Sequence, residues 1–204
     1  MTVASYSKFT HNDVLDLGLK VQSKSIFPTL PSILQPSASL IEFLSDVQGL
    51  PMSTEKAKSE FIVAPILREI RKRNIDKMTF FSGYNFNVDS KRGLKGRCDF
   101  ILSLMANTIS ITAPIFCLVE AKNDAPDDEN SISQCIAEMY AARLFNEKRK
   151  NTHITTLYGA VTNGYEWIFI QLIDDVAYVD IQHRHSVTNL PQLLGIFQYI
   201  IDKY

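Results

Sequence analysis

The most constraining feature of the sequence is an apolar run, Pro114 to Val119, that ends in Glu120, Ala121 and Lys122. A run this apolar is typical of a strand buried on both faces near the centre of a sheet. Side chains alternate between the two faces of a strand, so Glu120 and Lys122 should point the same way and Ala121 the other way. Glu-x-Lys alone is common on solvated strands, so the buried context is what makes this pair a candidate site.

A second predicted strand, residues 97–105, carries one carboxylate, Asp99. The turn before it contains two glycines and four basic residues, Lys91, Arg92, Lys95 and Arg97. An aspartate on one strand and Glu-x-Lys on the next are the chemically distinctive residues of the chain.

Hydrophobic periodicity and turn residues predict the other elements. Strands are expected at 78–88, 97–105, 115–121, 154–162, 165–173 and 176–181, and helices from Ser53 or Thr54 to about Arg73 and over 131–149 and 190–204. Pro65 should kink the first of these helices. Asn163-Gly164 is a strong signal for a two-residue hairpin. A capping box at Thr10–Asp13 predicts a short helix, residues 21–38 have the composition of a loop, and residues 40–44 fit either a helix or a strand.

The Asp99 and Glu120-x-Lys122 arrangement resembles the PD-(D/E)XK nuclease superfamily. The resemblance implies an α/β fold with a restriction-endonuclease-like α-β-β-β-α-β core, in which helices flank a central mixed sheet. The segment Gly159–Trp167, with Thr-Asn-Gly followed by a tryptophan, is similar to the nuclease domains of type I restriction enzymes. The resemblance covers roughly residues 54–173. We therefore expect residues 1–50 to be an N-terminal extension packing on the core and residues 51–204 to be the nuclease-like domain.

The resemblance also implies a metal site and roles for named residues. Asp99, Glu120 and the Ala121 carbonyl would hold Mg²⁺, or Mn²⁺ as a substitute, because Mg²⁺ takes oxygen ligands. Lys122 would orient the attacking water or stabilise negative charge, with Glu60 and Gln134 in support. Cys98 stands where the superfamily name has proline, and Glu138 stands where several families have an aromatic residue.

The implied function is a metal-dependent endonuclease that hydrolyses DNA in restriction, defence or repair. The alternative is a catalytically silent module of the same fold that binds nucleic acid or a protein partner. Lys91, Arg92, Lys95 and Arg97 would contact DNA phosphates, unless this turn is simply solvated. A homodimer or a separate partner subunit is also compatible with this function.

Composition sets the remaining expectations. The formal net charge of −1 neither supports nor excludes a polyanionic partner. No apolar stretch approaches the ~20 residues that span a membrane, and the three cysteines lack metal-site spacing. We therefore expect a cytoplasmic protein with reduced thiols and no membrane association. The segment His183–His185, with no acid in sequence to pair with, is expected at a surface edge.

Overall fold

A computed structural model describes residues 5–123, 125–151 and 153–204. In these residues, eight strands form one mixed sheet in the order β1-β7-β6-β5-β4-β3-β2, with β8 paired to β6. The strands are β1 (Lys20–Ser23), β2 (Thr79–Asn85), β3 (Arg97–Ser103), β4 (Ile115–Ala121), β5 (Thr156–Thr162), β6 (Glu166–Ile173), β7 (Val176–Val179) and β8 (His185–Ser186). The α/β class with a mixed sheet flanked by helices is thereby confirmed.

Strand β4 lies inside the sheet, as its composition predicts. Every residue of β4, Glu120 included, is buried. It pairs antiparallel with β3 and parallel with β5, and β3 pairs antiparallel with β2. The long helix α5 (Glu129–Lys148) makes the crossover that a parallel pair requires.

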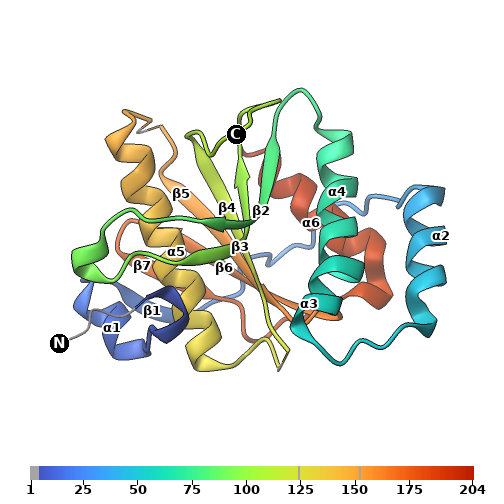
Figure 1. Cartoon of the computed structure of the whole chain (residues 1–204), viewed down its shortest axis with the longest axis horizontal. Helices are drawn as coiled ribbons and strands as arrows, with labels where there is room; N and C mark the ends of the chain where they lie inside the picture. Colours follow the sequence, from blue (N-terminus) through green and yellow to red (C-terminus); the bar gives the residue numbers. More distant parts are fainter. Residues whose placement is uncertain (1–4, 124, 152) are drawn as a thin grey trace.

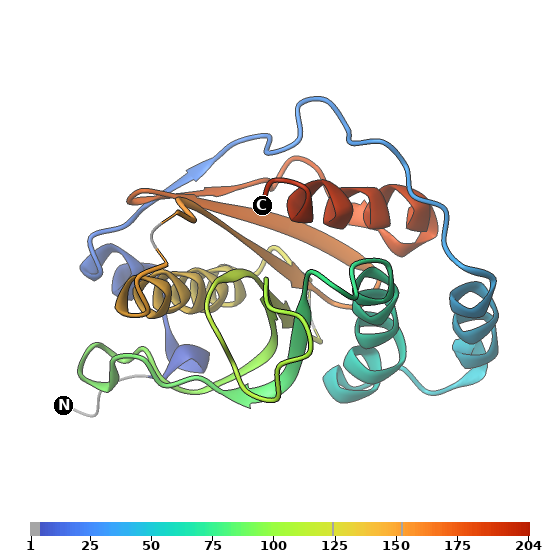
Figure 2. The ribbon, with the colours of Figure 1, turned by 90° about the horizontal axis from the view of Figure 1, so that it is seen from above.

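The other α-helices are α1 (His11–Asp16), α2 (Ala38–Asp46), α3 (Glu55–Lys58), α4 (Ala64–Arg73) and α6 (Leu190–Ile201). The sheet separates α5 from α6 and α4, whereas α2 lies farthest from the sheet (Figures 1 and 2). Between Ser131 and Ala142 almost every residue of α5 is buried, so this helix has no wide solvent face. Polar residues on this part of α5 must therefore find partners inside the protein.

The predicted helix from Thr54 to Arg73 is present, but it contains a π-helical turn. The Thr54 side chain caps α3 by accepting from the Ala57 N–H. A π-helical turn, Ser59–Val63, then joins α3 to α4, and Pro65 follows in the first turn of α4. The wider π turn changes which residues face inward. Ile62 and Val63 are buried, whereas Phe61 is only half-buried.

The N-terminal part of the chain is more ordered than its composition indicates. The predicted loop 21–38 is wrong at its start, because β1 pairs in parallel with β7, and residues 40–44 belong to α2. Thr10 and Asp13 form the predicted capping box of α1. Tyr6, Phe9, Val14, Leu19, Phe27 and Leu40 belong to the same hydrophobic core as the central strands.

Two turn and loop predictions need correction. Strands β5 and β6 form the predicted antiparallel hairpin, but the Asn163 N–H donates to the Glu166 carbonyl, so its two central residues are Gly164 and Tyr165. Gly164 has φ +89°, a left-handed conformation that favours glycine. The expected surface edge at 183–185 is wrong for His185, which is buried in β8 against Phe27 and Phe169. His183 does have an acidic partner, the buried Asp180, at 2.8 Å.

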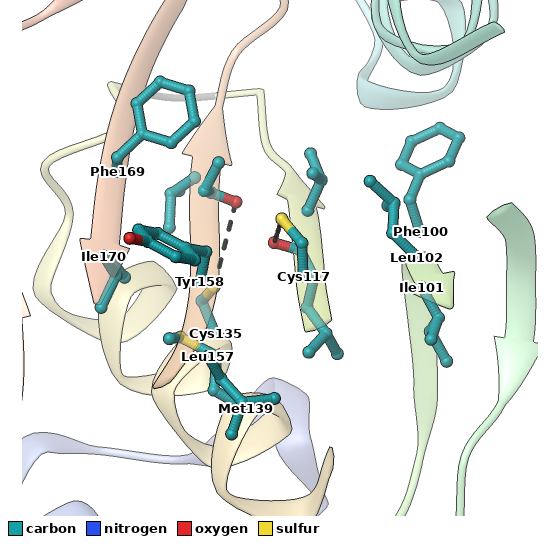
Figure 3. Close-up of a cluster of buried hydrophobic side chains, with 14 of the residues drawn as sticks. Phe100, Ile101, Leu102, Cys117, Cys135, Met139, Leu157, Tyr158, Phe169 and Ile170 are labelled. Atoms are coloured by element: carbon teal, nitrogen blue, oxygen red, sulfur yellow. Dashed lines mark hydrogen bonds between the residues drawn. The ribbon is translucent and has the colours of Figure 1, made fainter. Parts of the chain in front are cut away.

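The packing of α5 on β5 requires a residue without a side chain at Gly159. Figure 3 shows Cys135 and Met139 of α5 lying against β5 beside Leu157 and Tyr158. A Cβ on Gly159 would lie 2.5 Å from Met139 Sδ and 2.8 Å from Cys135 Sγ. Because the φ of Gly159 is not in the left-handed region, the constraint is steric rather than conformational.

We therefore predict that Gly159→Ala lowers the free energy of unfolding by about 1–3 kcal/mol, the usual cost of overpacking. The matched control is Gly49→Ala, because nothing lies within 4 Å of a Cβ built there. Urea unfolding followed by circular dichroism measures both. Equal stability of Gly159→Ala and the unmodified protein would contradict this account of how α5 packs on β5.

Candidate active site

Asp99 lies where β3 and β4 stop pairing. The ladder between these strands ends at the pair Phe100 and Val119. One residue beyond it, Asp99 Oδ2 accepts a hydrogen bond from the Ala121 N–H at 2.8 Å. The carboxylate therefore satisfies a backbone donor that the β3–β4 ladder leaves free, and this contact places Asp99 beside the end of β4.

Glu120 and Lys122 form an ion pair at the same end of β4. The distance from Lys122 Nζ to Glu120 Oε1 is 2.7 Å, and Glu120 is only 2% exposed. The Lys122 N–H donates to the Thr162 carbonyl of β5 at 2.7 Å, which keeps the chain in the sheet one residue beyond β4. The acid and the base thus lie together, as the alternation of side chains along a strand predicts.

Gln134 of α5 contacts both members of this pair. Its Nε2 donates to Glu120 Oε1 at 2.5 Å, and its Oε1 accepts from Lys122 Nζ at 2.9 Å. Nε2 also lies 3.1 Å from Glu138 Oε1, one helical turn farther along α5. Glu120 Oε2 and Glu138 Oε2 are buried acceptors without a hydrogen-bond partner in the part of the chain that the structure describes.

Burial and mutual repulsion control the protonation of the three acids. Burial raises the pKa of Glu120 well above its usual value, and the charges of Glu138 and Asp99 add to the shift. Burial also raises the pKa of Glu138, to about 8. For Asp99, burial raises the pKa more than the Ala121 hydrogen bond lowers it, and Glu55 adds to the rise. Burial lowers the pKa of Lys122, but Glu120 together with Glu55 and Asp99 raises it further than burial lowers it, so Lys122 stays protonated.

A hollow of about 370 Å³ opens in front of Asp99. Glu55, Lys56, Ser59 and Glu60 line it from α3 and the π turn, and Ser82, Gly83 and Arg97 line it from β2 and β3. Glu60 therefore reaches the same hollow as Asp99, but its exposed carboxylate pairs with Lys56 at 2.6 Å. Glu55, which the sequence analysis did not single out, lines the hollow and acts on both Asp99 and Lys122 through its charge.

The four basic residues of the predicted DNA-contacting turn lie in different surroundings. Arg97 lines the hollow beside Asp99. Arg92 is engaged elsewhere, because it pairs with Asp89 at 2.9 Å and donates to the Tyr140 hydroxyl of α5 at 3.1 Å. Lys91 is exposed, and Lys95 is half-buried with its carbonyl accepting from the Tyr6 N–H.

The donor set at the end of β4 fits a hard divalent cation. Mg²⁺ is usually bound through one or two carboxylates together with waters and substrate oxygens. Asp99 and Glu120 provide two carboxylates, and Glu120 Oε2 is a buried oxygen in need of a partner. No three histidine, cysteine, aspartate or glutamate residues come together as a metal-holding group within residues 5–123, 125–151 and 153–204. Any ion here would therefore take the rest of its ligands from the backbone and solvent.

Comparisons with known proteins do not assign a family. No protein-family model matches the chain. A 79-residue stretch is 33% identical to Protein THEM6 of Drosophila melanogaster, and it covers 37% of this chain and 39% of that protein. The chain thus spans about two-fifths of the length of this curated relative. Among the described helices, none combines the length and apolar character needed to cross a membrane.

The shifted acids predict a specific dependence of stability on pH. The pKa of Glu138 is about 8 in the folded protein against an ordinary value of 4.5, so between these values the folded state binds more protons than the unfolded state. The free energy of unfolding should therefore fall as pH rises from 5 to 8, with one such group contributing at most about 1.4 kcal/mol per pH unit.

Glu138→Gln removes this group and keeps an acceptor oxygen for Gln134. In the presence of a chelator, its unfolding free energy should fall less steeply between pH 5 and 8 than that of the unmodified protein. Urea titrations at four pH values in this range measure the two slopes. Parallel curves would mean that Glu138 does not carry a proton in the folded state.

Proposed function

We propose that this protein is a metal-dependent endonuclease that hydrolyses phosphodiester bonds of DNA, with the restriction-endonuclease-like core of the PD-(D/E)XK superfamily. The observation that carries the proposal is the joint position of Asp99, Glu120 and Lys122 at adjoining ends of β3 and β4. Lys122 Nζ is 2.7 Å from Glu120 Oε1, and Asp99 binds the backbone N–H of the residue between them.

The order of elements supports the same proposal. Helices α3 and α4 precede the antiparallel strands β2, β3 and β4, and α5 then leads to β5, parallel to β4. This is the α-β-β-β-α-β order that the resemblance implies. Gln134 on α5 reaches the Glu120–Lys122 pair, which agrees with the supporting role proposed for it.

In this proposal Asp99, Glu120 and the Ala121 carbonyl would hold Mg²⁺ or Mn²⁺, whose positive charge would offset the negative charge of the phosphate. Lys122 keeps its proton and lies half-buried beside the acids. Its ammonium group can therefore orient a water or stabilise a negatively charged oxygen of the substrate. Gln134 holds Lys122 in place by accepting a hydrogen bond from its ammonium group.

The DNA backbone would enter the hollow in front of Asp99. Arg97 offers a cation there, whereas Glu55 and Glu60 are acidic and would have to lie close to a metal rather than to a phosphate. We assign phosphate contacts to Arg97 first and to the exposed Lys91 second. Cytoplasmic location and action as a homodimer or with a partner subunit belong to the same proposal.

One observation favours a second candidate, a catalytically silent module that binds nucleic acid or a protein partner. Glu120 is buried, and one of its oxygens is already engaged by Lys122 and Gln134. A polar network of this kind can serve the fold alone. Metal binding distinguishes the candidates, because only the nuclease requires it.

The direct test is cleavage of supercoiled plasmid and single-stranded DNA with Mg²⁺ or Mn²⁺. Asp99→Asn keeps an oxygen for the Ala121 N–H, and Lys122→Met keeps most of the side-chain volume, so both should fold. Each should lose about 100-fold or more in rate, the scale of a positioned catalytic group. Matched controls are Asp46→Asn and Lys20→Met, which change exposed residues outside the site. Equal rates in all five proteins would refute the assignment of this site.

Metal binding should also stabilise the fold. At a metal concentration of 100 times Kd, the expected gain is about 2.7 kcal/mol, which raises Tm by several degrees in a chain of this size. The gain should be lost in Asp99→Asn and kept in Asp46→Asn. Differential scanning fluorimetry with Mn²⁺ measures it, and an equal rise in Tm for both variants would place the metal elsewhere.

A further inference from the structure

Glu138 is a buried acid that the proposed chemistry does not use. It is 0% exposed, it lies on α5 one turn after Gln134, and its Oε1 accepts from Gln134 Nε2 at 3.1 Å. Gln134 is therefore held by three charged or titratable groups, with Glu120 and Glu138 at its nitrogen and Lys122 at its oxygen.

A primary amide can be held in one orientation only if its two ends meet different partners. Its nitrogen carries two donors and its oxygen only accepts. Glu120 takes one N–H and Glu138 takes the other, which leaves the oxygen facing Lys122 Nζ. Rotating the amide by half a turn would direct its N–H groups at the Lys122 ammonium group, which has donors and no acceptor.

Of the three partners, only Glu138 belongs to the same helix as Gln134. Glu120 and Lys122 lie at the end of β4, where substrate and metal would approach. Glu138 contacts Gln134 from within α5, and the buried Cys98 lies beside it.

We propose that Glu138 is a positioning residue that fixes the Gln134 amide and, through it, the ammonium group of Lys122. The effect of Glu138 on catalysis rests on the proposed nuclease function, whereas its contact with Gln134 does not depend on that function. It also accounts for a polar residue at a place on α5 where packing alone would select an apolar side chain.

The variants that test it are Glu138→Met, which removes the acceptor, and Glu138→Gln, which retains one. With Mn²⁺ and a short duplex substrate, Glu138→Met should lower kcat about tenfold or more with little change in KM, whereas Glu138→Gln should keep kcat within about threefold. Adding Glu138→Met to Gln134→Met should cause no further loss, because the two residues act through one contact. Glu147→Met, an exposed glutamate on the same helix, is the matched control.

A second measurement does not require activity. The side-chain amide signals of Gln134, identified by their absence in Gln134→Met, should exchange slowly with solvent in the unmodified protein and in Glu138→Gln. They should shift and exchange faster in Glu138→Met, whose Tm should not fall. Unchanged Gln134 signals in Glu138→Met, or a kcat loss in Glu138→Gln as large as in Glu138→Met, would overturn the proposal. If the unmodified protein cuts no DNA, the nuclease proposal fails, and the amide signals still decide whether Glu138 holds Gln134.

Discussion

The structure depends on how a carboxylate is accommodated at the end of a buried strand. A buried ionised acid costs several kcal/mol unless nearby groups compensate it. Glu120 meets this requirement with Lys122 two residues later and with Gln134 from the helix that crosses between β4 and β5. The position of α5 and the close approach of that helix to Gly159 are consistent with this requirement, whereas Glu138 places a second buried acid beside Glu120.

The arrangement satisfies some polar atoms and leaves others without partners. Glu120 Oε1 receives donors from two side chains, while Glu120 Oε2 and Glu138 Oε2 receive none in the described residues. Fully satisfied buried networks rigidify a core, whereas unpaired buried acceptors are costly and call for a specific explanation. A cation beside Glu120 is the explanation that connects this cost to a function, and it would also reverse the upward shifts in the pKa of the acids.

Much of the fold could be predicted from the sequence because its signals are local. The apolar run before Glu120 identified the central strand, Thr54 identified a helix start, and the Asn163-Gly164 turn identified a hairpin. Contacts between segments far apart in the sequence could not be predicted. Nothing in Lys20–Ser23 shows that it pairs with β7, since its residues are mostly exposed and the pairing depends on Val176–Val179 far along the chain. Periodicity also missed the π turn, which moved Phe61 partly out of the core and brought Ile62 and Val63 into it.

The candidate site, too, could be predicted from the sequence only in part. Alternation along β4 was enough to place Glu120 with Lys122, and the resemblance to the nuclease superfamily pointed to Gln134 in support of them. The partner acid on the first helix was predicted as Glu60, but the structure brings Glu55 to the hollow as well and pairs Glu60 with Lys56. Arg92 was predicted to contact DNA phosphates, and the structure pairs it with Asp89 and with the Tyr140 hydroxyl. The contact of Arg92 with Tyr140 is set by the tertiary fold and leaves no local signal, whereas Lys56 and Glu60 are only four residues apart in the sequence.

The measurement that tests the central claim most directly is a crystal structure of the protein soaked in Mn²⁺, with anomalous scattering used to locate the ion. The account predicts an anomalous peak within ligand distance of both an Asp99 oxygen and a Glu120 oxygen, and its absence from a crystal of Asp99→Asn. A well-ordered site with no peak there at saturating Mn²⁺, or a peak that persists in Asp99→Asn, would contradict the account and favour a polar network that serves the fold alone.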